Sequence, residues 1–457
     1  MPSLPAERRQ AAARQLLEAD HANAPEVVAR AVLQQFTVKG FRSIAALKVT
    51  LPQFCVLVGP NGAGKTNVID ALKVFGEILS SLSASPLSDL GWHATVRRRQ
   101  RESKGGIVLG AEFGLYSAAD GGTSVGTTSP SLAATQVASV TVEFGFHRAS
   151  ADGAVIFKST AVTVRDASSK PVLRFRAPGA GAQTNELEIL DPGAAKRLGM
   201  IDDSRLSTSQ LMAMAAGFFG LQVGRNLPLM LLLSGRISSI LEVASKVTRF
   251  RLDAAALRAD SVGSSDGGGA LAGSGAGLAL AVERMRGTGK QPKPLFRKVL
   301  QALQSTYSRI EDVIPQRVSA GRVLLQFKER GIAEPLDQAS MSDGVLHALA
   351  LYIALFEPRA GILAIEEPEN AIHPWSLRKL VEAAQDSPNR VILTTHSETV
   401  VNAIRNPQAL FIVEQGDAGT TIERSLAKEE ALAAILSETG QRLGEVWMDG
   451  SLGGVPR

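Results

Sequence analysis

The sequence predicts an α/β fold in which a mixed β-sheet is flanked by helices. An apolar strand pattern at 54–58 runs through a glycine-rich loop into a helical pattern, the local structure of a phosphate-binding loop. From Leu336 onward, short buried strands alternate with helical segments, which is typical of a parallel sheet. Between these parts, strand patterns come first and helical patterns follow. We therefore expect one α/β core that is interrupted by a long insertion, first β-rich and then α-helical.

The loop at 59–66 has the pattern Gly-x4-Gly-Lys-Thr, which binds the phosphates of a nucleoside triphosphate. Its glycines let successive backbone N–H groups face the phosphates, and the following helix adds the positive end of its dipole. Lys65 is expected to reach the outer phosphates, and the Thr66 hydroxyl is expected to ligate Mg²⁺. The residues predicted to contact the nucleotide here are Gly59, Asn61, Gly62, Gly64, Lys65, Thr66 and Asn67.

Both flanks of this loop fit its interpretation. The run Phe54–Val58 suits a strand that is buried on both faces. After the loop, apolar residues recur at helical spacing: Val68, Ile69, Leu72, Phe75, Ile78 and Leu79. A glycine-rich turn with an incidental lysine would not need this strand, loop and helix. The sequence therefore predicts an ATP or GTP site, and it leaves open what the binding is for.

Composition narrows the class of protein. A chain of 457 residues is long enough for two or three domains. Its one cysteine, Cys55, excludes an intrachain disulfide and favours a reducing compartment, so we expect a cytoplasmic protein. The most apolar long stretch, 212–235, carries Gln222, Arg225 and Asn226 in its middle. We interpret it as buried helices and expect no membrane association.

The net charge of +5 is a modest basic excess that is compatible with nucleic-acid contact and does not require it. The densest basic run is Arg97-Arg98-Arg99-Gln100-Arg101, followed by Lys104. Two interpretations stay open for this run. It is either a solvated loop or a contact with the phosphate backbone of DNA, where several cations would displace counterions.

The order of patterns along the chain suggests four parts. Gln35–Phe41 and Leu47–Leu51 alternate like the strands of a hairpin that leads to the phosphate loop. Further strands are expected at 107–115, 140–146, 155–164, 172–176, 187–190 and 324–327, with a loop at 117–135, helices from 204 to 307 and a Gly/Ser-rich break at 263–277. We divide the chain into an N-terminal helical extension (1–33), the first part of the core lobe (34–115), an insertion or lid (116–323) and the second part of the lobe (324–457).

Two carboxylates follow the buried strand expected at 362–365. At the end of a parallel strand, they would lie beside the phosphate loop. There Glu366 could hold Mg²⁺ directly or through water, and Glu367 could accept a proton from the attacking water. An acidic helix start is the alternative, but the preceding strand and the following Pro368 favour a turn.

Two further segments add polar groups. His396 follows the strand expected at 391–394, where its imidazole could contact a terminal phosphate, although a lone histidine is more often structural. Ser342-Asp343-Gly344 precedes a helical run, and the free N–H groups of such a helix start could bind phosphate oxygens. Ordinary helix capping by Ser342 explains the same residues.

Together and in this order, these segments resemble the ATP-binding-cassette (ABC) ATPases, in the branch of the chromosome-maintenance (SMC) and RecF-type heads and the overcoming-lysogenization-defect (OLD) proteins. Gly59–Thr66 is similar to the Walker A loop, 342–344 to the signature motif, 362–367 to the Walker B strand, and His396 to the switch histidine. Phe41-Arg42-Ser43 resembles the start of RecF-type heads. The chain is most similar to a bacterial group of predicted "AAA family" ATPases that share Ile-Glu-Glu-Pro-Glu-Asn, Thr-His-Ser and a Leu-Gly-Glu-x-Trp ending. Glu366 stands where a magnesium-binding aspartate is commoner.

This resemblance implies a P-loop NTPase of the ABC head type that binds ATP and Mg²⁺ and hydrolyses ATP. It also implies an ATP-dependent homodimer, in which Ser342 and Gly344 of one subunit face the phosphate loop of the other. Glu367 and His396 would be the catalytic residues, and Thr66 and Glu366 would hold the metal. GTP is disfavoured because the chain has no Asn-Lys-x-Asp motif.

Spacing and length separate the members of this branch. The chain lacks the long heptads of a chromosome-maintenance or double-strand-break ATPase, and little sequence follows Ser397 that could form a nuclease domain. Two functions stay open. The first is an ATPase that acts on DNA in repair or maintenance, as RecF-type proteins do, and the second is an ATPase that regulates a separate effector protein in phage defence.

Overall fold

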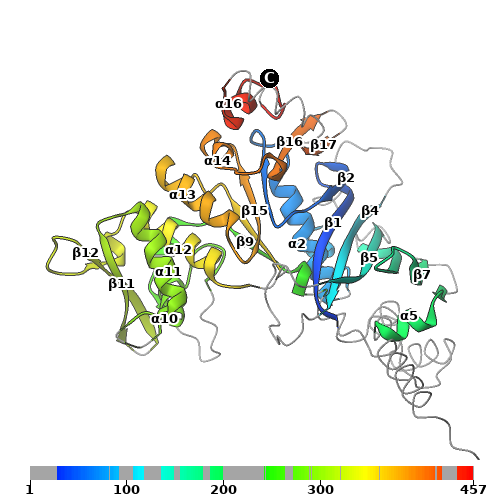
Figure 1. Ribbon diagram of the computed structural model, residues 1–457, viewed down its shortest axis with the longest axis horizontal. Helices are drawn as coiled ribbons and strands as arrows, with labels where there is room; N and C mark the ends of the chain where they lie inside the picture. The colour runs from blue at the N-terminus through cyan, green and yellow to red at the C-terminus, as the bar shows by residue number, and fades with distance from the viewer. Residues whose placement is uncertain are drawn as a thin grey trace, which may run out of the picture.

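A large mixed sheet organises the computed structural model (Figure 1). The structure describes residues 28–81, 83–91, 106–117, 135–148, 155–178, 186–198, 241, 243–262, 271–287, 289, 291–319, 321–359, 361–416, 419–424 and 440–455. Within them, 13 strands follow the order β8-β7-β6-β5-β4-β1-β2-β17-β16-β3-β15-β14-β9. The strands are β1 Val28–Phe41, β2 Ile44–Thr50, β3 Phe54–Val58, β4 Ile107–Ser117, β5 Gln136–Arg148, β6 Val155–Asp166, β7 Pro171–Pro178, β8 Glu186–Ile189, β9 Val247–Phe250, β14 Ile362–Glu366, β15 Arg390–Thr395, β16 Leu410–Gly416 and β17 Gly419–Arg424. The predicted mixed sheet is confirmed.

One end of the sheet is parallel and covered on both faces. β9, β14, β15, β3 and β16 pair in parallel in that order. Val56 and Val58 of β3 pack with helices α12 (Asp343–Phe356), α13 (Pro374–Gln385) and α14 (Glu398–Asn402), whereas Cys55 and Leu57 pack on the side of α2 (Lys65–Ser81). Every residue of β3, β14 and β15 is buried, as expected for parallel strands between layers of helices.

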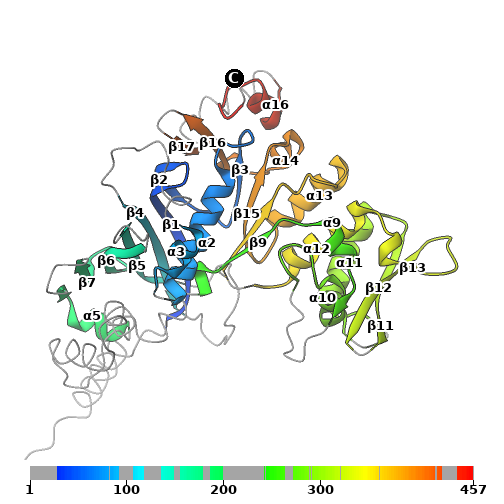
Figure 2. The ribbon, with the colours of Figure 1, turned by 180° about the vertical axis from the view of Figure 1, so that it is seen from behind.

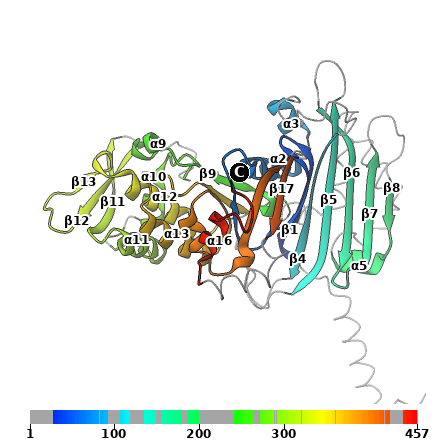
Figure 3. The same ribbon diagram turned by 90° about the horizontal axis from the view of Figure 1, so that it is seen from above.

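The other end of the sheet is antiparallel. β1 pairs with β2 and β4, and β5 to β8 continue outward from β4, with α3 (Ser85–Leu90) and α5 (Pro192–Arg197) beside them (Figure 3). Phe75 of α2 fixes the helix on this part of the sheet. Its ring centroid lies 5.8 Å from that of Phe36, 6.4 Å from that of Phe113 and 5.9 Å from that of Phe144. Such aromatic contacts stabilise packing beyond the buried area alone.

A second lobe lies beside the parallel end, seen from the two sides in Figures 1 and 2. It contains α9 (Ala254–Arg258), α10 (Leu278–Arg286), α11 (Pro294–Thr306) and a small antiparallel sheet of β10 (Ser261–Val262), β11 (Ile310–Ser319), β12 (Arg322–Glu329) and β13 (Leu336–Asp337). Short 3-10 turns at Gln338–Ser340 and Pro407–Ala409 and helix α16 (Leu443–Met448) complete the elements. Helix α12 is buried from Val345 to Leu355, so it joins the core of this lobe to that of the parallel strands.

The predicted strands at 107–115, 140–146, 155–164, 172–176 and 187–190 correspond to β4, β5, β6, β7 and β8. Because β5 to β8 extend the same sheet as β1 and β4, the described strands of the predicted insertion between 136 and 189 are part of the core sheet. The boundary at 323/324 is also misplaced. It cuts β12, which pairs with β11 on one side and with β13 on the other.

Several strands of the structure were not predicted, among them the start of β1, β9 and β11. Residues 28–33, assigned to the helical extension, form the start of β1, because pairing with β4 buries Leu33 opposite Phe113. β9 lies in a region expected to be helical, and β11 was not predicted. Both strands are held by long-range pairing that local propensity does not reveal. The predictions for the helix before residue 28, the basic run at 97–104, the apolar stretch at 212–235 and most of the loop at 117–135 lie outside the described residues.

Candidate functional site

Three neighbouring strands of the parallel end stop at the same level, and each carries residues predicted for the site. Val58 at the end of β3 lies opposite Thr395 of β15, and Thr394 of β15 lies opposite Glu366 of β14. The phosphate loop, the two carboxylates and His396 therefore leave the sheet side by side. This edge is where ligands bind in parallel α/β sheets.

Lys65 is buried at the first turn of α2. Its Nζ donates hydrogen bonds to the carbonyl oxygens of Gly59, at 2.7 Å, and Pro60, at 3.1 Å. Burial lowers the pKa of Lys65, and the nearby charges of Glu367, Glu369 and Glu366 act in the opposite direction. The lysine thus lies between the loop that would hold phosphates and the acidic strand end, as a phosphate-binding cation requires.

The phosphate loop rests on β16 and β17, which the sequence did not indicate. A β-carbon on Gly59 would lie 2.2 Å from the Val413 carbonyl oxygen, and one on Gly64 would lie 2.3 Å from Thr420 Oγ1. Thr420 Oγ1 in turn donates to the Ala63 carbonyl oxygen at 2.9 Å. The two glycines are therefore needed for close packing of the loop, in addition to their backbone freedom.

The turn after β1 is bound to α2. Asn67 Nδ2 donates to Ser43 Oγ at 2.6 Å, and Arg42 Nη1 donates to Asn67 Oδ1 at 3.3 Å and pairs with Asp70. Asn67, predicted to contact the nucleotide, is thus already engaged by the protein. At the tip of the loop, Asn61 and Gly62 are exposed, and Thr66 is half-buried next to Lys65.

Glu366 is buried at the end of β14, with 5% of its side chain exposed. Its Oε2 accepts a hydrogen bond from Arg249 Nη2 at 2.7 Å, and Arg249 Nη1 lies 3.0 Å from Asp70 Oδ1. The other oxygen, Oε1, is buried and has no hydrogen-bond partner within the described part of the chain. Burying a carboxylate oxygen without a partner costs free energy, so such an oxygen is suited to act as a ligand of a cation.

Glu367 follows in a strained turn. Its φ is +46°, a left-handed conformation that costs a non-glycine residue roughly 1–2 kcal/mol. Its N–H donates to the Thr394 carbonyl oxygen at 2.9 Å, and Asn370 Nδ2 donates to Glu367 Oε2 at 3.3 Å. Helix α13 begins only at Pro374, so the alternative of an acidic helix start is wrong. Backbone strain of this kind is concentrated at functional sites.

Glu369 connects the carboxylate turn to the end of β15. Its Oε1 accepts hydrogen bonds from Thr395 Oγ1 at 2.7 Å and from the His396 N–H at 3.0 Å, and it lies 3.3 Å from His396 Nδ1. His396 is 43% exposed, so it is not a buried structural histidine. The sequence analysis did not assign a role to Glu369. The sequence signal that could have indicated a role was the position of this third carboxylate, only two residues after Glu367.

Ser342 and Gly344 begin α12 in the second lobe. In the described residues, the Ser342 side chain makes no capping hydrogen bond and is exposed, so ordinary capping does not explain this serine. Arg258 fixes the segment by pairing with Asp343 and by donating to the Met341 carbonyl oxygen at 2.8 Å. The Ser342 hydroxyl is therefore available to a ligand or a partner.

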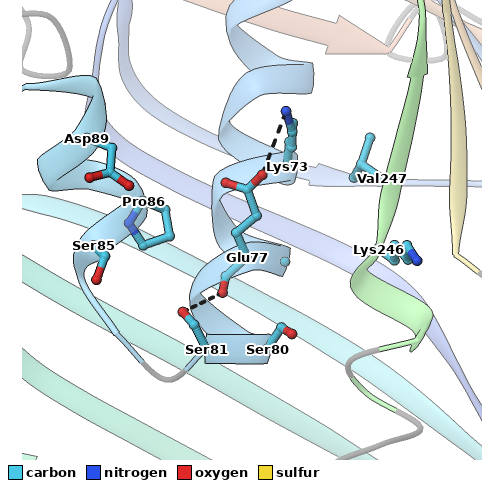
Figure 4. Close-up of a pocket in the computed structure, with 10 residues that line it drawn as sticks. Lys73, Glu77, Ser80, Ser81, Ser85, Pro86, Asp89, Lys246 and Val247 are labelled. Carbon is cyan, nitrogen blue, oxygen red and sulfur yellow. Dashed lines mark hydrogen bonds and ion pairs between the residues drawn. The ribbon is translucent and has the colours of Figure 1, made fainter. Parts of the chain in front are cut away.

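A cavity of about 240 Å³ adjoins the carboxylates and is lined partly by Phe250, His347, Glu366, Glu367 and Asn370. A larger pocket of about 620 Å³ lies between α3, the C-terminal half of α2 and the start of β9 (Figure 4). Its lining includes Lys73, Glu77 and Lys246 but none of the predicted site residues, whereas Glu366 and Glu367 both line the smaller cavity.

The residues at the strand ends fit a magnesium ion bound together with a nucleotide. Glu366 Oε1 supplies a buried oxygen without a hydrogen-bond partner in the described residues, and Thr66 supplies a hydroxyl on the adjacent helix. No group of three or more His, Cys, Asp or Glu side chains in the described ranges is arranged to hold a metal ion. A phosphate-loop site does not need one, because Mg²⁺ there takes most of its ligands from phosphates and water.

Residues 54–116 and 277–402 match the family model described as "AAA domain, putative AbiEii toxin, Type IV TA system". All residues predicted for the site lie within these two segments. The match supports an AAA-type ATPase domain. No curated protein matches the chain. No helix in the described residues is long and apolar enough to cross a membrane.

Among solved structures, the chain is similar to three Smc heads. One is bound to the C-winged helix domain of ScpA and shows 14% identity, a TM-score of 0.40 and coverage of 86% of this chain and 97% of that chain. Another, derived from Pyrococcus furiosus and bound to the C-terminal domain of ScpA, shows 13% identity and a TM-score of 0.41, and the match covers 90% of this chain and 100% of that chain. The head from Thermotoga maritima shows 14% identity and a TM-score of 0.35, and the match covers 86% of this chain and 98% of that chain. At these TM-scores, the similarity supports no further conclusion.

Proposed function

We propose that this chain is an ATP-hydrolysing switch of the ABC head type that dimerises when it binds ATP and acts on DNA. The meeting of the phosphate loop, the paired carboxylates and His396 at one sheet edge is the observation that carries the ATPase part of this proposal. These are the groups that phosphoryl transfer needs for holding phosphates, holding a metal and orienting water.

We assign each residue a role in keeping with its position. Lys65 and the loop N–H groups bind the β- and γ-phosphates, and Thr66 and Glu366 hold Mg²⁺, which neutralises charge on the phosphates when it is bound. Glu367 orients the attacking water and accepts its proton. His396, held by Glu369, would sense the terminal phosphate.

The proposal of a dimer rests on the exposed start of α12. Ser342 lies in the second lobe and its hydroxyl is not used for capping in the described residues. We propose that it binds the γ-phosphate held by a second copy, together with the N–H of Gly344. Loss of that phosphate on hydrolysis would remove the contact between the copies, so ATP would bias an equilibrium between two assembly states.

A Glu367→Gln variant tests the ATPase and the dimer together. We expect it to bind ATP, to lose turnover by at least about 100-fold and to accumulate as a dimer in gel filtration with ATP. Lys65→Ala should lose nucleotide binding. Glu334→Gln, on an exposed turn, is the matched control and should behave like the wild type. A purely monomeric Glu367→Gln protein at saturating ATP would refute the dimer, and unchanged affinity in Lys65→Ala would refute the site.

The action on DNA rests on the basic run at 97–104, and its test is stimulation of ATP hydrolysis by duplex DNA. Stimulation should fall steeply between low and moderate salt, because counterions are released at the phosphate backbone. The matched family description names a toxin of a type IV toxin–antitoxin system. This description favours a second candidate, an ATPase that regulates a separate effector protein in defence. Turnover that is insensitive to DNA, with a protein copurifying with Glu367→Gln and ATP, would support that candidate instead.

A further inference from the structure

Arg249 lies at the parallel edge of the sheet, outside the segments that match the family model. It pairs in register with Ala364 on β14, and Glu366 comes two residues later on that strand. Residues two apart on a strand point to the same face. The Arg249 side chain therefore runs along β14 toward the carboxylate of Glu366.

Two carboxylates hold the Arg249 guanidinium in one place. Nη2 contacts Glu366 Oε2 at 2.7 Å, and Nη1 contacts Asp70 Oδ1 at 3.0 Å. Asp70 lies on α2, five residues after Lys65, and its other oxygen pairs with Arg42. Glu366, Arg249, Asp70 and Arg42 thus form a chain of alternating charges that ties β14, β9, α2 and the β1–β2 turn together.

This arrangement decides which oxygen of Glu366 is free. Arg249 already engages Oε2, whereas Oε1 has no hydrogen-bond partner in the described part of the chain, so Oε1 is the oxygen more readily available to another ligand. A glutamate has one more rotatable bond than the aspartate that is commoner at this position. Without Arg249, the longer side chain would sample several positions, and ordering it on metal binding would cost conformational entropy.

We propose that Arg249 is a positioning residue that fixes Glu366 so that Oε1 faces the Mg²⁺ of a bound nucleotide. The inference rests on the proposed ATP site. The Asp70 carboxylate offsets the positive charge of Arg249, so the guanidinium orients Glu366 with little repulsion of the metal. Groups that orient metal ligands in this way typically change metal affinity by about 10- to 100-fold when they are removed.

The test measures Mg²⁺ affinity without measuring turnover. A fluorescent ATP analogue is bound to wild type and Arg249→Gln at increasing Mg²⁺. We expect the Mg²⁺ concentration for half-maximal tightening to rise about 10-fold in Arg249→Gln, with nucleotide affinity in EDTA unchanged. Arg249→Lys should have an intermediate Mg²⁺ affinity, and it replaces Arg249→Gln in the experiment if that variant is poorly folded. Arg405→Gln, which removes an exposed arginine pair with Asp386, is the matched control and should not change Mg²⁺ affinity.

A double variant separates orientation from a general structural effect. In Glu366→Asp, the shorter carboxylate no longer reaches Arg249, so adding Arg249→Gln should change Mg²⁺ affinity less than twofold. An equal loss in both backgrounds would overturn the proposal, and so would tighter Mg²⁺ binding by Arg249→Gln, which would make Arg249 a competitor of the metal. If the wild type itself binds no nucleotide, the proposed ATP site is refuted and the inference about Arg249 falls with it, whereas normal nucleotide binding with unchanged Mg²⁺ affinity in Arg249→Gln refutes only the role of Arg249.

Discussion

Replacing Gly64 with alanine tests whether the phosphate loop depends on the strand beneath it. Gly64 has a φ of +106°, and a β-carbon there would lie 2.3 Å from Thr420 Oγ1, 2.8 Å from Thr420 Cγ2 and 2.9 Å from Ser43 Oγ. Thr420 cannot retreat easily, because it is buried in β17 and bonded to the Ala63 carbonyl oxygen. The loop must therefore move away from the sheet to accept the methyl group.

Gly62 provides the comparison that gives the magnitude. It also has a positive φ, of +83°, but a β-carbon there would meet nothing within 4 Å. Gly62→Ala should cost only the left-handed strain, roughly 1–2 kcal/mol. Gly64→Ala should add about 1–3 kcal/mol of overpacking. An extra 2 kcal/mol corresponds to about a 30-fold greater loss of ATP affinity if the loop must return to its original position to bind.

The assay combines equilibrium binding of a fluorescent ATP analogue with thermal unfolding of the nucleotide-free protein. Both the affinity for the ATP analogue and the unfolding temperature should be highest in the wild type, lower in Gly62→Ala and lowest in Gly64→Ala. Thr420→Ala removes the two nearest atoms, so Gly64→Ala should cost about 1 kcal/mol less in that background. Equal effects of the two glycine substitutions, or no relief by Thr420→Ala, would refute the packing argument.

Three further predictions concern the site. Glu369→Gln should slow ATP hydrolysis about 10-fold in a steady-state assay while ATP affinity changes little, because the bonds that hold His396 weaken; unchanged turnover would contradict this. Burial lowers the pKa of Lys65, and only its charged amine attracts phosphate. ATP affinity should therefore begin to fall at a lower pH than it would if this lysine were exposed. Measuring ATP affinity from pH 7 to about pH 10, with unfolding followed in parallel, checks this prediction. Arg258→Ala should weaken ATP-dependent dimerisation, measured by light scattering, but not nucleotide binding by the monomer, because it frees the segment that carries Ser342.

The parts of the site that the sequence predicted are those in which chemistry restricts both residue type and spacing. A phosphate loop needs its glycines, lysine and threonine in one short segment, and the carboxylates must follow a buried strand. These patterns are local, so they can be read without a structure. The register of Val58 with Thr395 and of Thr394 with Glu366 then confirms that the predicted segments meet.

The parts that were missed depend on contacts between distant segments. Thr420 reaches Ser43 across 377 positions of sequence, and Arg249 reaches Glu366 across 117. A threonine in a surface-like strand pattern and an arginine before Phe250 carry no local sign of these roles. β9 itself was missed for the same reason, because a strand of four residues shows no clear alternation and is fixed by pairing with β14.

The contact between the two lobes explains how events at the carboxylates could reach the surface that bears Ser342. A β-carbon on Gly344 would lie 2.9 Å from the Ala371 carbonyl oxygen, so the first turn of α12 rests directly on the backbone of the turn that begins with Glu367. Helix α12 is buried along most of its length and would move as a rigid body. A shift of the Glu367 turn on nucleotide binding would therefore be passed to Ser342 through one backbone contact. In this arrangement, the carboxylate turn of one lobe and the surface of the other lobe that bears Ser342 are mechanically adjacent, although helix α12 and strand β14 separate them in sequence.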